Sequence, residues 1–381
     1  MLFFKKEAVL GIDASNLVSG GGLRHLVEFL SHAQPNEFDF DKVTLWVGPT
    51  TAKKIHIKAD WLHIVEVKEF EKGLFSRFLW RARYMKPYVN EHCSVLFSPG
   101  GLTLGCDVPE VTMSRNMQPF DEVARKRIPW SKPRLRLELL KVFQARSFRK
   151  ANEVIFLNEF AQSTLSSMLA LTKGVVIPHG CSKAFQLEPR QQKGFGDNSD
   201  IDVLYVSTLD TYKHQIEVIE AIAKLRTKYS GIKLTLVGSG DSEYGELVKS
   251  KIHEIDAKEA YIRYVGEVGL GELTQYYHNS DIFLYASSCE NLPNILLEAM
   301  SAGLPIACSN IQPMPSILKR GGAYFNPESV ESIAGSLDDL IKNIDKRKDC
   351  SMLAFEESQT YSWQKCTDET FAVLRDAISS I

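Results

Sequence analysis

The sequence has 381 residues, of which 44% are hydrophobic and 24% charged, the composition of a globular chain with room for two domains of average size. This composition excludes collagen-like, coiled-coil and disordered proteins. The net charge of −2 hides an asymmetry, because residues 1–182 carry 25 lysines and arginines against 18 acidic residues, whereas residues 183–381 carry 20 against 29. The basic first half indicates an anionic partner, either a membrane surface or a phosphorylated substrate.

The apolar runs and the cysteines predict a cytoplasmic protein. The apolar runs are far shorter than the roughly 18–20 residues of a membrane span. Lys5, Lys6 and Glu7 occupy the positions where a signal peptide has its apolar stretch. The seven cysteines are scattered and lack a C-x-x-C spacing, so we expect reduced thiols rather than a zinc site or a disulfide framework.

Short β-rich runs alternate with longer helical patterns along the chain. In the first half the predicted strands are 9–13, 42–48, 62–67, 94–99, 110–114, 153–158 and 174–180. A polar, glycine-containing stretch at 183–200 is typical of an interdomain linker. After it, the predicted strands are 202–208, 233–239, 260–266, 281–287, 305–310 and 323–327. This alternation predicts two α/β domains, each a doubly wound parallel sheet that binds ligands at the carboxyl ends of its strands.

Three glycines at 20–22 follow the first predicted strand and lead into an amphipathic helix. Glycine lets backbone N–H groups approach a phosphate or a sugar closely, and the N-terminus of a helix adds partial positive charge. The spacing differs from the dinucleotide-binding G-x-G-x-x-G pattern. A plain flexible turn explains these glycines equally well.

The stretch from Ser287 to Pro305 carries two glutamates eight residues apart, Glu290 in a loop and Glu298 on a predicted helix. If the helix begins near Pro293, its free N–H groups can hold a diphosphate, and Glu298 can accept hydrogen bonds from a ribose diol. The alternative is an ordinary surface glutamate followed by a buried helix.

This stretch, ENLPNILLEAMSAGLP, resembles the E-x7-E signature of the family-4 retaining glycosyltransferases of the GT-B fold. Similar family elements are the glycines at 20–22, VIPHG at 176–180, VSTLDTYKHQ at 206–215 and YSWQKCTDETFAVL near the end. The resemblance implies two Rossmann-like domains that face a cleft, with the last helix crossing back to the first domain. The implied acceptor-binding domain is 1–182 plus 364–381, the linker is 183–200, and the nucleotide-sugar-binding domain is 201–363.

The resemblance also implies roles for single residues. Glu298 would hold the donor ribose, Glu290 would contact the donor sugar near the reacting carbon, and Lys213 would neutralise the departing diphosphate. Backbone amides would complete the donor site, with no metal and no cofactor. The implied donor-binding residues are Gly21, Gly22, Thr208, Lys213, Glu290, Asn291, Leu292, Pro293, Asn294, Ile295 and Glu298.

Two positions depart from the family pattern. Thr208 stands where the family has an arginine, so one expected cation is missing. Arg115 stands where the family often has a histidine, and we expect it to supply the charge that Thr208 lacks. Arg115 is therefore grouped with Glu290 and Lys213 as a candidate catalytic residue; the alternative is that it pairs with a nearby carboxylate.

Basic residues interleaved with apolar ones are concentrated at 76–86 and at 122–150, where ten cations face two acids. Such segments suit the surface of an anionic membrane. The alternative is that the apolar residues belong to the core and the cations are simply solvated. Nucleic acid is the weakest candidate and is not expected as a partner.

These observations predict a retaining, metal-independent hexosyltransferase. Its substrates would be a nucleotide-sugar donor and a lipid-linked glycan acceptor, with polyprenyl diphosphate as the carrier. It would act in surface polysaccharide, O-antigen or lipopolysaccharide biosynthesis, as a peripheral protein on the cytoplasmic face of the inner membrane. The alternatives are a sugar-nucleotide epimerase or phosphorylase of the same fold, and a non-catalytic donor-binding partner protein.

Overall fold

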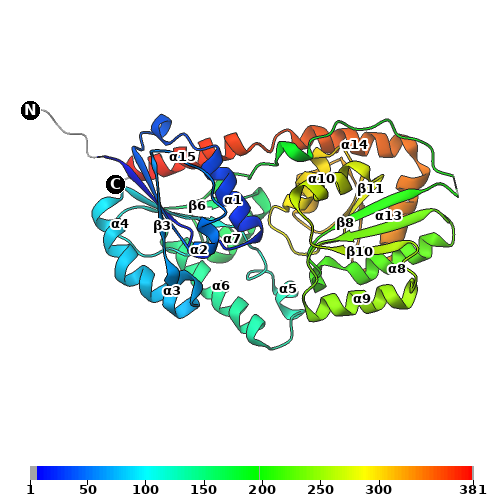
Figure 1. Ribbon diagram of the computed structural model, residues 1–381, viewed down its shortest axis with the longest axis horizontal. Helices are drawn as coiled ribbons and strands as arrows, with labels where there is room; N and C mark the ends of the chain where they lie inside the picture. The colour runs from blue at the N-terminus through cyan, green and yellow to red at the C-terminus, as the bar shows by residue number, and fades with distance from the viewer. Residues whose placement is uncertain (1–6, 197, 380–381) are drawn as a thin grey trace, which may run out of the picture. The chain divides into compact units, whose positions relative to one another are not determined.

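The computed structural model describes residues 7–196 and 198–379, which divide into two compact units (Figure 1). The first unit contains the chain up to Phe120, Trp130–Gly180 and the segment from Ser362. The second contains Asp121–Pro129 and Cys181–Tyr361. Each unit is built on one parallel sheet with helices on both faces.

The first sheet has seven parallel strands in the order β3-β2-β1-β4-β5-β6-β7. Most are short runs of buried Val, Ile, Leu and Phe, as expected for strands that helices cover on both faces. The strand order reverses between β1 and β4. The strands are β1 (Val9–Asp13), β2 (Lys42–Val47), β3 (Leu62–Glu66), β4 (Val95–Ser98), β5 (Glu110–Ser114), β6 (Glu153–Phe156) and β7 (Val175–Val176).

The helices of the first unit include the long helix α6, which Ser131 caps at its N-terminus, and α7, which Asn158 caps. A short π-helix, Arg81–Met85, joins α3 to α4. The α-helices are α1 (Gly20–Ser31), α2 (Pro49–Ala52), α3 (Leu74–Trp80), α4 (Lys86–His92), α6 (Lys132–Lys150), α7 (Glu159–Leu169) and α15 (Trp363–Ser379).

The second sheet has six parallel strands in the order β10-β9-β8-β11-β12-β13, which reverses between β8 and β11. Its strands are β8 (Ile201–Val206), β9 (Ile232–Val237), β10 (Ile262–Gly266), β11 (Ile282–Tyr285), β12 (Ile306–Ser309) and β13 (Gly322–Phe325). Its α-helices are α5 (Glu122–Lys126), α8 (Gln215–Arg226), α9 (Glu243–Ile255), α10 (Leu270–Asn279), α11 (Asn294–Ser301), α12 (Met314–Leu318), α13 (Val330–Lys342) and α14 (Ile344–Ser358). Every strand expected from the sequence is present, so the predicted fold class is confirmed.

The last helix, α15, belongs to the first unit, where it packs against α1, β4 and β5. Its first residue, Trp363, stacks on His179 with ring centroids 5.5 Å apart and meets His25 edge-on at 5.4 Å. Gly180 lies so close to the helix that a Cβ there would be 2.2 Å from the Trp363 nitrogen. The VIPHG motif is therefore the docking point of α15, and His179 has a packing role.

His25 predicts a pH dependence for the stability of the first unit. Burial, with Arg115 and His179 adding to it, lowers the pKa of His25 well below its usual value. Below about pH 6.5, His25 is therefore protonated in the unfolded chain but stays neutral in the folded chain. As a result, the free energy of unfolding falls as the pH falls. Between pH 7 and pH 5.5, urea denaturation should show a fall in the free energy of unfolding that is smaller by about 1.3 kcal/mol in His25→Gln than in the wild-type protein. Equal falls in the two proteins would contradict this assignment.

Apart from shifts of two residues, at 181–182 and at 362–363, the unit boundaries differ from the expected domains in two places. Residues 121–129 fall inside the expected first domain but belong to the second unit. The expected linker, 183–200, also belongs to the second unit. There the buried guanidinium of Arg347 donates to the carbonyl of Lys193 and to that of Ile341, at 2.7 Å from the latter. These hydrogen bonds link the extended segment 183–200 to α13. The segment is polar because it lies on the surface of the second unit, not because it is a linker between the units.

All seven cysteines are free thiols. Within 7–196 and 198–379 there is no group of His, Cys, Asp or Glu side chains arranged to hold a metal ion. In the same residues no helix has the length and apolar character that crossing a membrane requires.

Candidate active site

The candidate site of the second unit lies where the strand order reverses, at the carboxyl ends of β8 and β11. Open α/β sheets bind their ligands at this point because the two loops diverge there and leave a crevice. The loop after β8 carries Thr208 and Lys213, and the loop after β11 carries Glu290. The structure therefore brings together residues that are 77 positions apart in the chain.

Lys213 and Glu290 form an ion pair whose side chains are only 6% and 15% exposed. Glu290 Oε1 also accepts hydrogen bonds from the Tyr285 hydroxyl and from Ser287 Oγ, each at 2.6 Å. The Lys213 ammonium donates to the Tyr285 hydroxyl at 3.2 Å. Charge and hydrogen bonds thus fix the Glu290 carboxylate from three sides.

Two buried tyrosines support this pair. Burial raises the pKa of Tyr205 and of Tyr285 well above the usual value, so both stay protonated and act as donors. The Tyr205 hydroxyl donates to the carbonyl of Lys213 at 2.5 Å. His214, at a φ of +53°, then turns the chain into α8. Hydrogen bonds therefore hold both the backbone and the side chain of Lys213.

The helix α11 begins at Asn294, after the N-cap residue Pro293, and no side chain of the described residues caps it. The Leu296 amide donates to the Pro293 carbonyl at 3.1 Å, whereas the amides of Asn294 and Ile295 precede any intrahelical acceptor and carry partial positive charge. Asn294 and Ile295 are partly exposed, whereas Asn291, Leu292 and Pro293 are buried. Such a helix start can hold an anion.

Glu298 lies further along α11 and is only 2% exposed. Its Oε2 accepts a hydrogen bond from the hydroxyl of Tyr277 at 3.0 Å, and Tyr277 comes from the neighbouring helix α10. The carboxylate is thus buried and oriented by Tyr277. Thr208, by contrast, has an exposed side chain, and its carbonyl accepts from Gln215 Nε2 at 2.9 Å.

The remaining predicted residues, Gly21, Gly22 and Arg115, lie in the first unit. The expected glycine loop is instead the first turn of α1, which begins at Gly20. The Arg115 guanidinium donates to the carbonyls of Gly21 and Gly22, at 3.2 Å from the latter. Burial lowers the pKa of Arg115 to about 10. These contacts are with backbone carbonyls, and the role of Arg115 in catalysis stays a prediction.

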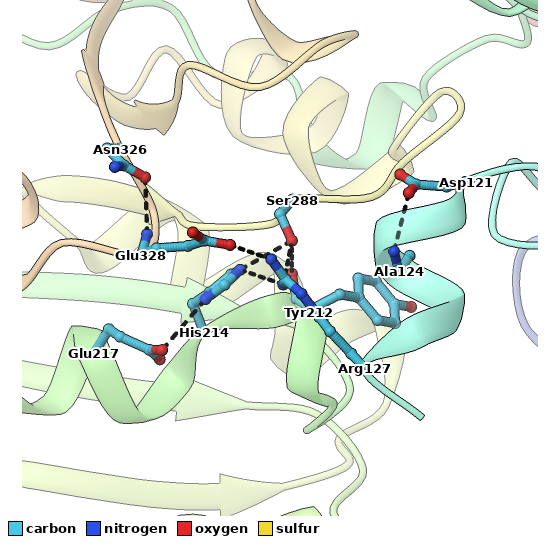
Figure 2. Close-up of polar contacts among 9 residues, drawn as sticks. All are labelled: Asp121, Ala124, Arg127, Tyr212, His214, Glu217, Ser288, Asn326 and Glu328. Carbon is cyan, nitrogen blue, oxygen red and sulfur yellow. Dashed lines mark hydrogen bonds and ion pairs between the residues drawn. The ribbon is translucent and has the colours of Figure 1, made fainter. Parts of the chain in front are cut away.

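A residue that the sequence did not single out, Arg127, lies beside the Lys213 loop (Figure 2). In the sequence it is one of ten cations in 122–150, and nothing in its spacing distinguishes it from the others. In the structure it borders a cavity of about 390 Å³. The other residues around this cavity are Thr211, His214, Ile216, Glu217, Tyr244 and Glu328.

The two basic segments supply an exposed apolar surface on the first unit, formed by α3 and α6, which we call the α3–α6 surface. The two helices lie close together, since Arg77 on α3 is within electrostatic range of Arg136 on α6 (Figure 1). The large apolar side chains on it, each 49–79% exposed, are Leu74, Phe75, Phe78, Leu79, Leu135, Leu139, Val142 and Phe143.

Not every cation of these segments is available to an outside partner. Arg81 is buried and pairs with Asp13, and Arg134 is buried and pairs with Glu138 at 2.8 Å. Arg125 is also buried, and it lies on α5 in the second unit. The observed α3–α6 surface therefore differs from the predicted one. It lacks these buried cations and the whole of α5, but it has the exposed apolar side chains.

Residues 188–356 match the family model described as glycosyl transferases group 1. The O-antigen chain mannosyltransferase B of Escherichia coli is 26% identical over 167 residues, which are 44% of this chain and 44% of that protein. The aligned segment thus spans less than half of this curated relative. Two solved structures have the same fold. Sucrose-phosphate synthase of Thermosynechococcus elongatus is 14% identical, with a TM-score of 0.76, and HepE of Anabaena in complex with UDP-glucose is 16% identical, with a TM-score of 0.72. Each alignment covers 98% of this chain and 100% of the other chain. Residues 188–356 are therefore similar to the group 1 glycosyl transferases, and the fold of the chain is GT-B.

Proposed function

We propose that the protein is a retaining, metal-independent hexosyltransferase. It moves a sugar from a nucleoside-diphosphate sugar to a membrane-associated glycan acceptor, carried on polyprenyl diphosphate, in surface polysaccharide or O-antigen biosynthesis. The observation that carries this proposal is the buried Lys213–Glu290 pair at the strand-order reversal of the second sheet. It is supported by the UDP-glucose that HepE binds and by the name of the E. coli relative.

The donor would lie across the carboxyl ends of β8 and β11. An ammonium group has three N–H donors, and Lys213 directs two of them at Glu290 and Tyr285. The third would donate to a diphosphate oxygen, together with the first-turn amides of α11. Glu298 would accept from the ribose diol. These groups supply the positive charge that a divalent cation supplies in other nucleotide-sugar sites, which is why we propose a metal-independent reaction.

Glu290 would act on the transferred sugar. Its carboxylate would accept from a sugar hydroxyl and stabilise the positive charge that develops at the anomeric carbon as the diphosphate leaves. The leaving diphosphate would depart on the same face that the acceptor hydroxyl approaches, which retains the anomeric configuration. The first unit would bind the acceptor.

A thermal-shift screen against UDP, GDP, ADP, dTDP and their common sugars tests the donor site. A ligand present at about a hundred times its Kd adds about 2.7 kcal/mol of stability. We expect one nucleotide family to raise the melting temperature selectively. We expect Glu298→Ala to abolish that shift, because it removes the oriented carboxylate on α11.

The matched control is Glu331→Gln, which changes an exposed glutamate on α13 of the same unit. It should leave the nucleotide shift intact. If no nucleotide stabilises the wild-type protein, the donor-site proposal fails. If one does and Glu298→Ala keeps the full shift, the proposed role of Glu298 fails alone.

The membrane part of the proposal rests on the α3–α6 surface. Exposed aromatic and aliphatic side chains beside cations suit the headgroup region of an anionic leaflet. Bound to the cytoplasmic face of the inner membrane through this surface, the protein would reach a lipid-linked acceptor in the same membrane.

Sedimentation with vesicles tests it. We expect the protein to sediment with phosphatidylglycerol vesicles and much less with phosphatidylcholine vesicles. The double variant Phe75→Asp/Phe78→Asp should weaken the binding by at least about tenfold, because it removes two exposed aromatics and adds negative charge. The control is Leu247→Asp, which changes another exposed apolar residue (56%), on α9 of the second unit. Equal binding of both variants would contradict the proposal.

A further inference from the structure

The segment 121–129 is the one stretch between β5 and α6 that belongs to the second unit, and it lies outside the family-matched residues 188–356. Its short helix, α5, is capped by Asp121, which accepts from the Ala124 amide at 2.9 Å (Figure 2). Asp121 also contacts Cys289 in the loop after β11, where burial and this carboxylate raise the pKa of the thiol. The segment is thus attached to the candidate site at its start.

It is attached again at its end, through Arg127. Arg127 Nη1 donates to Ser288 Oγ at 2.8 Å and to His214 Nε2 at 3.0 Å, and Nη2 forms an ion pair with Glu328 (Figure 2). A guanidinium can only donate, so Nε2 of His214 must be the unprotonated ring nitrogen. The other ring nitrogen then carries the hydrogen and faces Glu217 Oε1 at 3.4 Å. The hydrogen bonds of the guanidinium and the imidazole are therefore mutually consistent.

The two residues that Arg127 joins come from the two loops of the candidate site. His214 directly follows Lys213 in the loop after β8. Ser288 directly follows Ser287, the residue that donates to Glu290, in the loop after β11. The loops also touch through their backbones, since the Ser288 amide donates to the Tyr212 carbonyl at 2.8 Å. Arg127 spans this junction from outside both loops.

We propose that Arg127 is a positioning residue, which holds the loops after β8 and β11 together and so keeps Lys213 and Glu290 at their pairing distance. Its pairing with Glu328 neutralises the guanidinium, so it acts through the loops rather than as a further charge on the diphosphate. The consequence for donor binding rests on the proposed function; the loop contact itself does not.

Hydrogen exchange followed by mass spectrometry tests the loop contact without any ligand. In Arg127→Ala, peptides covering 207–214 and 287–293 should exchange about tenfold faster, the effect of losing hydrogen bonds to a charged group. The control is Lys126→Ala, which alters the exposed last residue of α5, a cation that pairs only with Glu122 among the described residues. Faster exchange throughout the second unit would instead indicate general unfolding. In that case Ser288→Ala, which removes a single hydroxyl partner, must reproduce the local effect or the proposal fails.

Nucleotide binding tests the consequence. With the nucleotide that stabilises the wild-type protein, we expect Arg127→Ala to weaken the affinity about tenfold and Lys126→Ala to leave it unchanged. The loss should disappear in a Lys213→Met background, because Arg127 acts through Lys213. An equal loss in that background would mean direct contact with the ligand and would overturn the proposal. If the wild type binds no nucleotide, the proposed function fails while the exchange result still decides the loop contact.

Discussion

Replacing Glu290 with glutamine should lower the rate of sugar transfer by about 10²–10³-fold, the cost of removing one preorganised electrostatic contact to a transition state. Glutamine keeps the shape of the side chain, and its carbonyl oxygen can still accept from Tyr285 and Ser287. What it removes is the negative charge opposite the anomeric carbon. Donor affinity should change only a few-fold, because the diphosphate and the ribose are held by other residues. The measurement is kcat and KM for nucleoside-diphosphate release with the donor identified by thermal shift.

Glu331→Gln again serves as the control and should retain the wild-type kcat. The loss of charge also leaves Lys213 buried without its carboxylate, so the variant must first be shown to be folded at the assay temperature. A folded Glu290→Gln enzyme with wild-type kcat would falsify the assignment of Glu290 as a catalytic residue. A loss confined to KM would instead place Glu290 in ground-state binding.

The strands of both sheets could be predicted because parallel strands covered on both faces are short, continuous apolar runs. The largest error in length concerns β7, expected over 174–180 and observed over Val175–Val176. This strand is at the edge of its sheet, and the residues that follow include Pro178, which has no N–H to donate. The chain leaves the sheet there to form the docking point of α15.

Residues of the candidate site could be predicted only where they belong to one short, continuous motif. The E-x7-E stretch places Glu290 in a loop and Glu298 on a helix, and both lie there in the structure. The partner of Glu298 could not be predicted, because Tyr277 approaches from another helix and no periodic pattern links the two positions. The contacts of the Tyr285 and Ser287 hydroxyls with Glu290 could not be predicted either, because in the sequence both residues simply end an apolar strand.

The position of Arg127 depends on whether the segment 121–129 packs in the first or in the second unit. The amino-acid composition of the segment does not indicate which. Charge density indicated the region 122–150 as a single basic surface. The structure divides it at Trp130, with α5 in the second unit and α6 in the first. Local sequence determined the helices, with Asp121 and Ser131 as N-caps, but not the unit against which each helix packs.

Replacing Lys213 with methionine should weaken nucleoside-diphosphate binding by about a hundredfold and leave the affinity for the free nucleoside unchanged. Methionine keeps the aliphatic stem within the buried site but removes the ammonium, and a charge-assisted hydrogen bond to phosphate is roughly twice as strong as a neutral one. The comparison of nucleoside with nucleoside diphosphate isolates the phosphate term. Isothermal titration calorimetry with the two ligands measures both affinities.

The same substitution removes the counter-charge of Glu290, whose side chain is only 15% exposed. We expect the free energy of unfolding of the apo protein to fall by about 2–3 kcal/mol, below the cost for a fully buried pair because solvent still reaches the carboxylate. The control is Lys224→Met, an exposed lysine (56%) on α8 whose pairing with Glu331 should contribute little. If Lys213→Met weakens the nucleoside and its diphosphate equally, Lys213 acts by shaping the loop after β8. If only the diphosphate is affected, the ammonium itself contacts the phosphate, and the missing arginine at Thr208 is compensated within the same loop.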